Sequence, residues 1–248
     1  MLFSNVIEFT RLLISLDTVN PPGNEAVAAE LTGTLLKENG FKLTNIPYGS
    51  NRHHLVAEKG CDSGKPILIF TGHFDTVPLG AKEWTVDPFG GETIDGKIYG
   101  RGSSDMKGGV AAMVGAAINA FAETEPQCGV KLLFTADEET GCKGAGHLVQ
   151  QLSLQEEVIG IVVGEPTANV PVIGQKGGLY LKVTTSGKTA HSSMPHLGDN
   201  AIYKAAKAIL KAEQFEFNVV EDDLLGFSTI NVGRMQGGLN LNSVPDYA

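Results

Sequence analysis

The sequence predicts an α/β protein with a mainly parallel sheet, flanking helices and a smaller α+β domain. Three observations support this prediction. Short apolar runs at 66–70, 131–134 and 160–163 alternate with helical patterns, which is the order typical of a parallel sheet. Each run passes directly into polar residues that can bind a metal ion. After residue 174 the pattern changes to strand, helix and strand, which indicates a second domain.

Two helices are expected first, at 4–16 and 25–39, because apolar residues recur there at helical spacing. Between them the segment NPPG at 20–23 predicts a rigid turn. Gly40 follows the second helix at the position where a C′ glycine belongs.

The middle of the chain contains shorter elements. Strands are expected at 41–46 and 54–57, before the first apolar run. Asp95-Gly96 lies between two short strand patterns and predicts a hairpin. The segment 108–121 is helical and rich in small residues, which suits close packing under a sheet. The three apolar runs are expected to be buried strands.

The second domain is expected to be a half-exposed antiparallel sheet with one helix. Residues 179–185 alternate with a period of two, a helix is expected at 200–215, and a further strand at 227–233. We therefore expect two domains, at 1–174 and 175–248.

Composition excludes several classes of protein. The 248 residues include 19 Lys+Arg against 28 Asp+Glu, a net charge of −9, so nucleic acid is not an expected partner. Three cysteines form no CxxC pair, which fits reduced thiols in the cytoplasm better than disulfides. The first helix is interrupted by charges, so it predicts neither a signal peptide nor a membrane span.

Metal-binding side chains gather where the three apolar runs end. In open α/β sheets ligands bind outside the carboxyl ends of the strands. The first run ends in His73 and Asp75, the second in Glu138 and Glu139, and the third in Glu165. Asp105 lies in a glycine-rich segment before a helix. One His and several carboxylates make up the ligand set of a zinc hydrolase.

Each of these residues taken alone has a plainer interpretation. His73 could be a hydrogen-bonded loop residue, although Asp75 could accept its second ring N–H as metal-binding histidines require. Asp105 could cap the helix that follows it. Glu138 and Glu139 could be solvated loop charges. The positions after the three strands and Asp105 together favour a metal centre more strongly than any one of them does.

Five motifs occur in order along the chain: GHFDTVP at 72–78, WTVDPF at 84–89, YGRGSSDMKGG at 99–109, DEETG at 137–141 and GEPT at 164–167. Together they resemble the signature of the co-catalytic zinc amidohydrolases. This family includes acetylornithine deacetylase, succinyl-diaminopimelate desuccinylase, aminoacylase and bacterial glutamate carboxypeptidases. The resemblance covers nearly the whole chain.

The resemblance implies a zinc-peptidase-like catalytic domain with two Zn²⁺ ions, for which Co²⁺ can substitute. It assigns His73 and Glu165 to one zinc, Asp105 to a position that bridges both, and Glu139 to the second. Glu138 would be the general base that takes a proton from the attacking water and passes it to the departing amine.

The same resemblance gives roles to other residues. Asp75 is counted with the catalytic residues, as the carboxylate beside the histidine ligand. The family also implies a cis peptide bond between Asp105 and Met106. AHSSMP at 190–195 resembles a motif whose histidine, here His191, reaches the active site of a partner subunit and steadies the oxyanion. GG…NSVP at 237–245 resembles a segment whose asparagine, here Asn242, contacts substrate.

The resemblance therefore implies a homodimer that forms through a lid and dimerisation domain at 175–248, with the catalytic domain at 1–174. Family members continue beyond this segment and supply a last His ligand for the second zinc, whereas this sequence ends at Ala248. We expect both domains to be incomplete, the chain to be truncated at its C-terminus, and its own hydrolytic activity to be weak.

The substrate is less well defined. The desuccinylase usually carries an Arg-rich segment where this chain has GQKGGLY at 174–180, so an acetylornithine deacetylase-like deacylase is favoured. Succinyl-diaminopimelate desuccinylase and a small-peptide carboxypeptidase are the alternatives. A hypothesis from another class is an inactive fragment, or a non-catalytic binding or dimerisation protein that keeps the fold.

Overall fold

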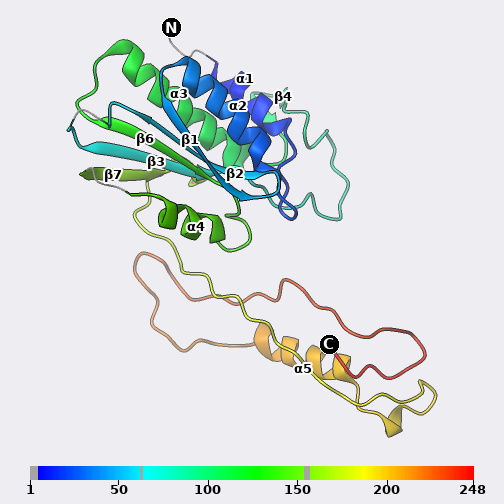
Figure 1. The fold of residues 1–248 in the computed structure, drawn as a ribbon. Coiled ribbons are helices and arrows are strands. Elements are labelled where there is room, and N and C mark those ends of the chain that lie inside the picture. The colour runs from blue at the N-terminus through cyan, green and yellow to red at the C-terminus, as the bar shows by residue number, and fades with distance from the viewer. Residues whose placement is uncertain (1–4, 62–63, 154–156) are drawn as a thin grey trace. The chain divides into compact units, whose positions relative to one another are not determined.

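The computed structural model describes residues 5–61, 64–153 and 157–248. The chain forms two compact units, Met1–Val170 and Pro171–Ala248. The first unit carries the sheet and most of the helices (Figure 1).

The sheet of the first unit has the strand order β1-β2-β6-β3-β7. Its strands are β1 (Lys42–Gly49), β2 (Arg52–Lys59), β3 (Ile67–His73), β6 (Gly129–Thr135) and β7 (Val158–Val163). β3 is parallel to both β6 and β7, whereas β2 is antiparallel to both β1 and β6. All strands except β2 therefore run in one direction, which confirms the predicted mainly parallel sheet.

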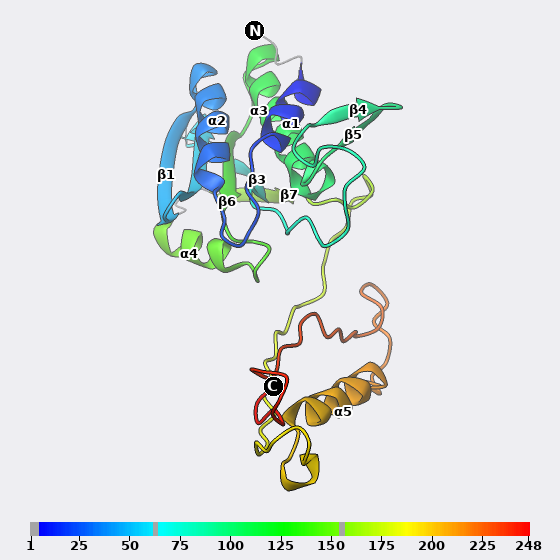
Figure 2. The same ribbon diagram turned by 90° about the vertical axis from the view of Figure 1, so that its right-hand side faces the viewer.

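Helices lie on both faces of this sheet. α1 (Val6–Ile14), α2 (Glu25–Glu38) and α3 (Gly108–Glu123) cover one face, and α4 (Lys143–Gln151) lies on the other (Figures 1 and 2). The first predicted helix was expected to begin at residue 4, which lies outside the described residues. Among the residues described, no helix is long and apolar enough to cross a membrane.

The core lies between the sheet and the first three helices. α3 contributes small and β-branched side chains, as its composition predicts, and the sheet contributes larger ones such as Leu55, Leu132 and Phe134. Each fully buried aliphatic or aromatic side chain contributes about 1.5–3 kcal/mol to stability. This packing holds β3 and β6 rigidly under the residues that follow them.

Two of the predicted turns are confirmed. Asp95 and Gly96 both have positive φ angles, 49° and 74°, and connect β4 (Glu92–Ile94) to β5 (Lys97–Tyr99) in an antiparallel hairpin. Gly40 follows α2 with a φ of 79°, a left-handed conformation that favours glycine.

The burial predicted for the third apolar run is wrong. β7 is the edge strand of the sheet and pairs with β3 alone. Ile159, Ile161 and Val163 are 56%, 61% and 55% exposed. Apolar composition favours burial but cannot supply the covering layer, and no such layer lies over this strand among the described residues.

The second unit contains α5 (Ala201–Glu213), close to the helix predicted at 200–215, and a short 3₁₀ turn at Pro195–Leu197. The strands predicted at 179–185 and 227–233 are not formed in the described structure. Leu179, Tyr180 and Leu181 are all more than 70% exposed. An alternating pattern becomes a strand only where one face is buried and a neighbouring strand accepts its hydrogen bonds, and in the described structure only Thr185, the last residue of the first segment, pairs its backbone, with Ala248.

Candidate metal centre and active site

The ends of β3, β6 and β7 bring the predicted site residues to one edge of the sheet. His73, the last residue of β3, pairs in register with Thr135 at the end of β6. Thr71 of β3 pairs with Val163 at the end of β7. The segments that carry Glu138, Glu139 and Glu165 therefore leave the sheet beside His73.

His73 is almost fully buried and is fixed through both ring nitrogens. Nδ1 lies 2.9 Å from the backbone carbonyl oxygen of Asp75, while the Asp75 carboxylate Oδ1 is 3.6 Å away. The ring therefore donates to the carbonyl group, while the Asp75 carboxylate, which was predicted as the acceptor, lies beside Nδ1 at ion-pair distance. A carbonyl oxygen only accepts, so Nδ1 carries a proton and Nε2 faces the other site residues.

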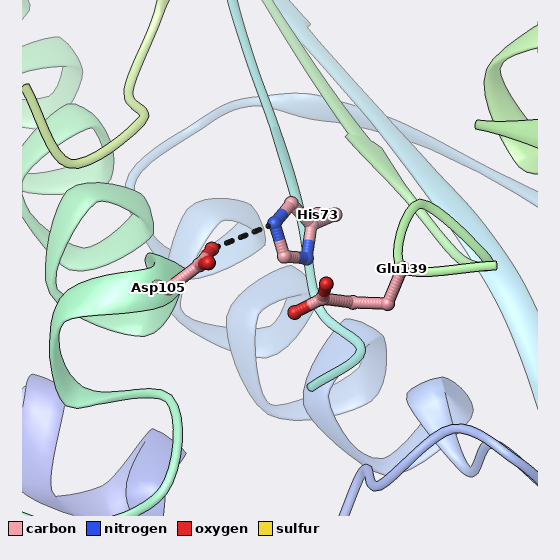
Figure 3. Close-up of side chains that lie close together, drawn as sticks. All are labelled: His73, Asp105 and Glu139. Atoms are coloured by element: carbon pink, nitrogen blue, oxygen red, sulfur yellow. Dashed lines mark hydrogen bonds and ion pairs between the residues drawn. The ribbon is translucent and has the colours of Figure 1, made fainter. Parts of the chain in front are cut away.

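Three carboxylates surround Nε2 of His73. The nearest oxygens are Asp105 Oδ1 at 3.1 Å, Glu165 Oε1 at 3.5 Å and Glu138 Oε2 at 4.0 Å. Glu139 belongs to the same group, since one ligand atom each from His73, Asp105 and Glu139 all lie within 4.8 Å of one another. Figure 3 shows both carboxylate groups close to the imidazole ring, carried by different segments of the chain. We call His73, Asp105, Glu138, Glu139 and Glu165 the outer cluster.

Asp105 lies in an irregular turn, Ser103–Lys107, that precedes α3. The Asp105–Met106 peptide bond is cis, as the family resemblance implied. Asp105 does not cap α3, because the N-cap position is Lys107 and no side chain accepts a hydrogen bond there. The buried Lys107 amino group donates to the carbonyl of Leu16, which ties this turn to the end of α1.

The glycine at position 109 allows α3 to approach the Glu165 segment closely. A Cβ atom on Gly109 would lie 2.1 Å from the backbone oxygen of Gly164, far inside van der Waals contact. Because Gly164 immediately precedes Glu165, this contact brings Glu165 next to the turn that carries Asp105.

The outer cluster has too little positive charge for its carboxylates. Burial, followed by the charge of Asp105, raises the pKa of Glu139 to about 7. Burial also raises the pKa of Glu165. Burial lowers the pKa of His73, but its interactions with Asp105 and Asp75 outweigh this effect and raise the pKa to about 11. A cation placed among these oxygens would compensate their charge.

These residues fit a bound zinc ion. Oε1 of Glu139 is buried and has no hydrogen-bond partner among the described residues, a costly state for a carboxylate oxygen unless a cation contacts it. Imidazole nitrogen and carboxylate oxygen are ligands that Zn²⁺ prefers. The Nδ1 hydrogen bond of His73 gives the ring the orientation found in metal-binding histidines.

The remaining predicted residue of the first unit, Asp75, holds the backbone of the two adjacent glutamates. Its carboxylate oxygens accept hydrogen bonds from the backbone N–H groups of Glu138 and Glu139, each at 3.1 Å. The Glu138 side chain is 35% exposed, and its Oε1 accepts a hydrogen bond from the thiol of Cys142 at 3.1 Å. Its other oxygen faces His73.

A buried polar network lies behind the outer cluster, and the sequence did not predict it. It is centred on Asp137, whose carboxylate accepts hydrogen bonds from the side chains of Asn20, Tyr48 and Thr140. Arg52 lies 3.3 Å from Asp137 and forms a bidentate ion pair with the fully buried Glu25. We call this group the inner network; its members are Asn20, Glu25, Tyr48, Arg52, Asp137 and Thr140.

Only part of the inner network left a signal in the sequence. Asn20 precedes two prolines, which indicates a fixed turn, and Asp137 begins a run of three acidic residues after a strand. Glu25 and Arg52 follow no local pattern, because their pairing depends on how α2 packs against β2.

In the second unit, the two predicted residues lie on neighbouring segments. Ser192 N–H donates to the backbone oxygen of Asn242 at 3.0 Å, and His191 forms an isolated bridge with Ser243. The exposed His191 ring accepts a hydrogen bond from Ser193 N–H through Nδ1 at 3.2 Å.

Comparison with known proteins gives one family. Residues 69–231 match the model of peptidase family M20/M25/M40, which is more than half of the chain. A succinyl-diaminopimelate desuccinylase of Rhodospirillum centenum is 38% identical over 217 residues, which is 82% of this chain and 55% of that protein. A second, from Wolbachia pipientis, is 32% identical over 251 residues, 96% of this chain and 62% of its own.

A solved structure shares the fold. The M20 family metallo-carboxypeptidase Sso-CP2 from Sulfolobus solfataricus has a TM-score of 0.69 and 18% sequence identity, and the match covers 99% of this chain and 69% of that one. The chain spans about half the length of the curated relatives it matches.

Proposed function

The chain belongs to peptidase family M20/M25/M40, and from this premise we propose that it is the zinc-binding part of an enzyme that hydrolyses an amide bond in an N-acyl amino acid. The observation that carries the proposal is the outer cluster. The carboxylates of Asp105 and Glu165 lie 3.1 and 3.5 Å from the imidazole of His73, and a carboxylate oxygen of Glu139 lies within 4.8 Å of ligand atoms of His73 and Asp105, at the carboxyl end of a central strand.

His73, Asp105 and Glu165 would hold one Zn²⁺, and Asp105 and Glu139 would hold a second. When bound, zinc supplies a Lewis acid that polarises the scissile carbonyl and the attacking water. The distances among the side chains support the shared position of Asp105, because its carboxylate lies closer to His73 than that of Glu165 does and also lies within 4.8 Å of a carboxylate oxygen of Glu139.

Glu138 would act as the general base. Its Oε2 faces the cluster 4.0 Å from His73 Nε2, while its backbone N–H is fixed by Asp75. A partly exposed carboxylate in this place can take a proton from water and release it to the departing amine. Glu139 beside it is directed into the metal site, so two adjacent carboxylates take two roles.

The relatives support an N-succinyl substrate of the succinyl-diaminopimelate class better than the acetylated substrate favoured by the sequence. The preference for an acetylornithine deacetylase rested on the missing Arg-rich segment at 174–180. That segment lies entirely in the second unit, outside the residues that form the outer cluster.

We assign the second unit, by the same resemblance, as a lid and homodimerisation domain in which His191 steadies the oxyanion and Asn242 contacts substrate. The pairing of their segments supports a common role. Sedimentation equilibrium tests this assignment: a dimer that becomes monomeric when exposed apolar residues such as Leu179 and Leu181 are changed to Ser would support it, and a monomeric parent chain would contradict it.

Metal content and hydrolysis together test the proposed function. Zinc per chain should be measured after dialysis against limited zinc, for the parent chain and for His73→Ala, with His196→Ala as a matched control on an exposed histidine. We expect zinc to be lost from His73→Ala alone. The rates at which N-succinyl-diaminopimelate, N-acetylornithine and a dipeptide are hydrolysed, measured by the release of free amine, then rank the substrates. A parent chain that binds no zinc would refute the proposal.

A further inference from the structure

Asn20 is held beside the active-site residue Asp75 by pairing of the backbone. Asn20 N–H donates to the carbonyl of Thr76 at 2.8 Å, and Thr76 N–H donates to the carbonyl of Thr18 at 3.1 Å. The buried hydroxyl of Thr18 donates to the carbonyl of Phe74 at 2.7 Å. The segment before the two prolines therefore runs parallel to the chain that continues β3, in a fixed register.

The side chain of Asn20 joins two buried carboxylates. Its Nδ2 atom donates to Asp75 Oδ2 at 2.9 Å and to Asp137 Oδ1 at 2.7 Å, so both amide hydrogens are used. Asn20, Asp75 and Asp137 are 3%, 0% and 5% exposed. At this position a neutral amide can donate to both anions, whereas Asp has no donor when ionised and Ser has one.

The two carboxylates that Asn20 joins position the backbone of the two adjacent glutamates, Glu138 and Glu139. Asp75 accepts the backbone N–H groups of Glu138 and Glu139. Asp137 directly precedes that pair and adopts a left-handed backbone conformation with a φ of 64°. Asp75 therefore fixes the two N–H groups of the pair, and the Asp137 carboxylate fixes where the turn begins.

On the basis of the proposed function, we propose that Asn20 is a positioning residue for the metal centre. Its amide locks Asp75 to Asp137 and so sets the place of Glu138 and Glu139 relative to His73. In the described structure the Asn20 side chain donates its hydrogen bonds to Asp75 and Asp137 and to no member of the outer cluster, so it acts through the two aspartates. Substrate contact is not required for this role.

Three substitutions separate this role from a general contribution to folding. Asn20→Ala removes both donors, Asn20→Ser keeps one, and Asn20→Asp replaces them with a third negative charge. Asn24→Ala is the matched control, because Asn24 lies in the same connection and, among the described residues, its amide donates only to the carbonyl of Asp17, at 3.2 Å.

The first measurement uses the metal-free chain and follows amide hydrogen exchange by NMR. We expect the Glu138 and Glu139 amides to exchange at least about tenfold faster in Asn20→Ala and Asn20→Asp, with Asn20→Ser intermediate. Amides in α3 should exchange at the rates of the parent chain. In the control variant Asn24→Ala, all amides of the first unit should do so. A uniform acceleration through the first unit would indicate a structural role alone and overturn the proposal, as would unfolding of all three variants.

The second measurement is metal affinity. Loss of a hydrogen-bonded partner behind metal ligands typically lowers affinity about 10–100-fold, and we expect this loss for zinc in Asn20→Ala and Asn20→Asp. The visible absorption spectrum of the Co²⁺-loaded chain should change in shape in the same variants. Parent-like affinity and spectrum in a zinc-binding chain would overturn the inference. A parent chain without zinc would refute the proposed function, and hydrogen exchange alone would then decide the role of Asn20.

Discussion

Asp137 and Glu139 are two residues apart in one turn, yet their side chains enter opposite environments. Asp137 belongs to the inner network, where Asn20, Tyr48 and Thr140 donate hydrogen bonds to its carboxylate. Glu139 belongs to the outer cluster, where its Oε1 is buried and, in the part of the chain that the structure describes, has no hydrogen-bond partner.

The difference shows that donors, rather than burial alone, decide the state of a buried carboxylate. Burial raises the pKa of both groups. In Asp137 the hydrogen bonds and the charge of Arg52 outweigh burial and hold the pKa well below its ordinary value. In Glu139 the neighbouring carboxylates add to burial, and the pKa rises to about 7. A carboxylate supplied with donors stabilises the fold, and one without them is suited to bind a cation.

The largest expected effect tests the division inside the outer cluster. Glu138→Gln removes the proposed base but keeps the shape of the side chain and the ligand set. In a full-length enzyme that carries this segment, we expect turnover to fall on the order of 10²–10⁴-fold while zinc content is unchanged. Glu139→Gln is the matched variant and should lose zinc from the second position. Zinc loss in Glu138→Gln, or near-normal turnover, would contradict the two roles.

The inner network should respond through stability. Asp137→Ala leaves the buried donors of Asn20, Tyr48 and Thr140 without an acceptor and places alanine in a left-handed conformation. We expect the metal-free chain to lose about 3–5 kcal/mol in free energy of unfolding. Asp137→Asn tolerates the same backbone and keeps an acceptor, so it should lose clearly less. Urea unfolding measures both, and equal losses in the two variants would show that the donors are unimportant.

The contrast between the two groups also explains which parts of the site could be predicted. The outer cluster follows from strand ends: in a parallel sheet the residues after β3, β6 and β7 must meet at one edge, so His73, Glu139 and Glu165 could be placed together from sequence. The inner network depends on contacts between distant segments. Asn20 and Asp137 are 117 residues apart in sequence, and no local pattern pairs them.

The failures at the sheet edge and in the second unit have a related cause. Residues 160–163 and 179–185 carry apolar patterns typical of strands, but burial and pairing depend on neighbours that lie elsewhere in the fold. The local sequence pattern indicates which secondary structure a segment can form, whereas its neighbours in the fold decide which one it forms.

A third test concerns His54, which supports the turn from the side of the inner network. Ala136 N–H donates to His54 Nδ1 at 3.0 Å, so Nε2 carries the proton and donates to His147 Nδ1 at 3.1 Å. Burial, followed by the charges of His147 and Arg52, lowers the pKa of His54 from 6.5 to about 4. The unfolded chain therefore takes up the second imidazole proton of His54 more readily than the folded chain does.

Stability from His54 should be fully present above about pH 6.5 and be lost as the pH falls towards 4. The shift corresponds to a loss of about 3 kcal/mol. His54→Gln should flatten the dependence of unfolding free energy on pH in this window, compared with the parent chain and with His196→Gln, whose site is exposed. Asp75 and Asp137 also lose stability on acidification, so the difference between the curves isolates His54. Parallel curves would show that His54 is protonated at little cost.

The smallest expected effect is the most direct test of the contrast between Asp137 and Glu139. Folding raises the pKa of Glu139 from 4.5 to about 7, so its ionisation opposes folding increasingly from pH 4.5 to 7 and fully above that range. Because the side chain is partly exposed, solvent screening reduces this cost to about 1 kcal/mol. Glu139→Gln should therefore stabilise the metal-free chain by about that amount at pH 8.

With zinc present, the sign of the Glu139→Gln effect should reverse. Zinc stabilises a folded chain by an amount that grows with the logarithm of its affinity, and the substitution removes a carboxylate ligand, so the variant should gain less from zinc than the parent chain does. Asp137→Asn should instead destabilise the chain both with and without zinc. The Asp137 carboxylate accepts its hydrogen bonds from protein side chains, and these bonds do not depend on the metal. Thermal unfolding of both variants with excess zinc and with chelator gives four values to compare. If Glu139→Gln destabilises the metal-free chain as Asp137→Asn does, then both carboxylates stabilise the fold and the difference between the two sides of the turn is lost.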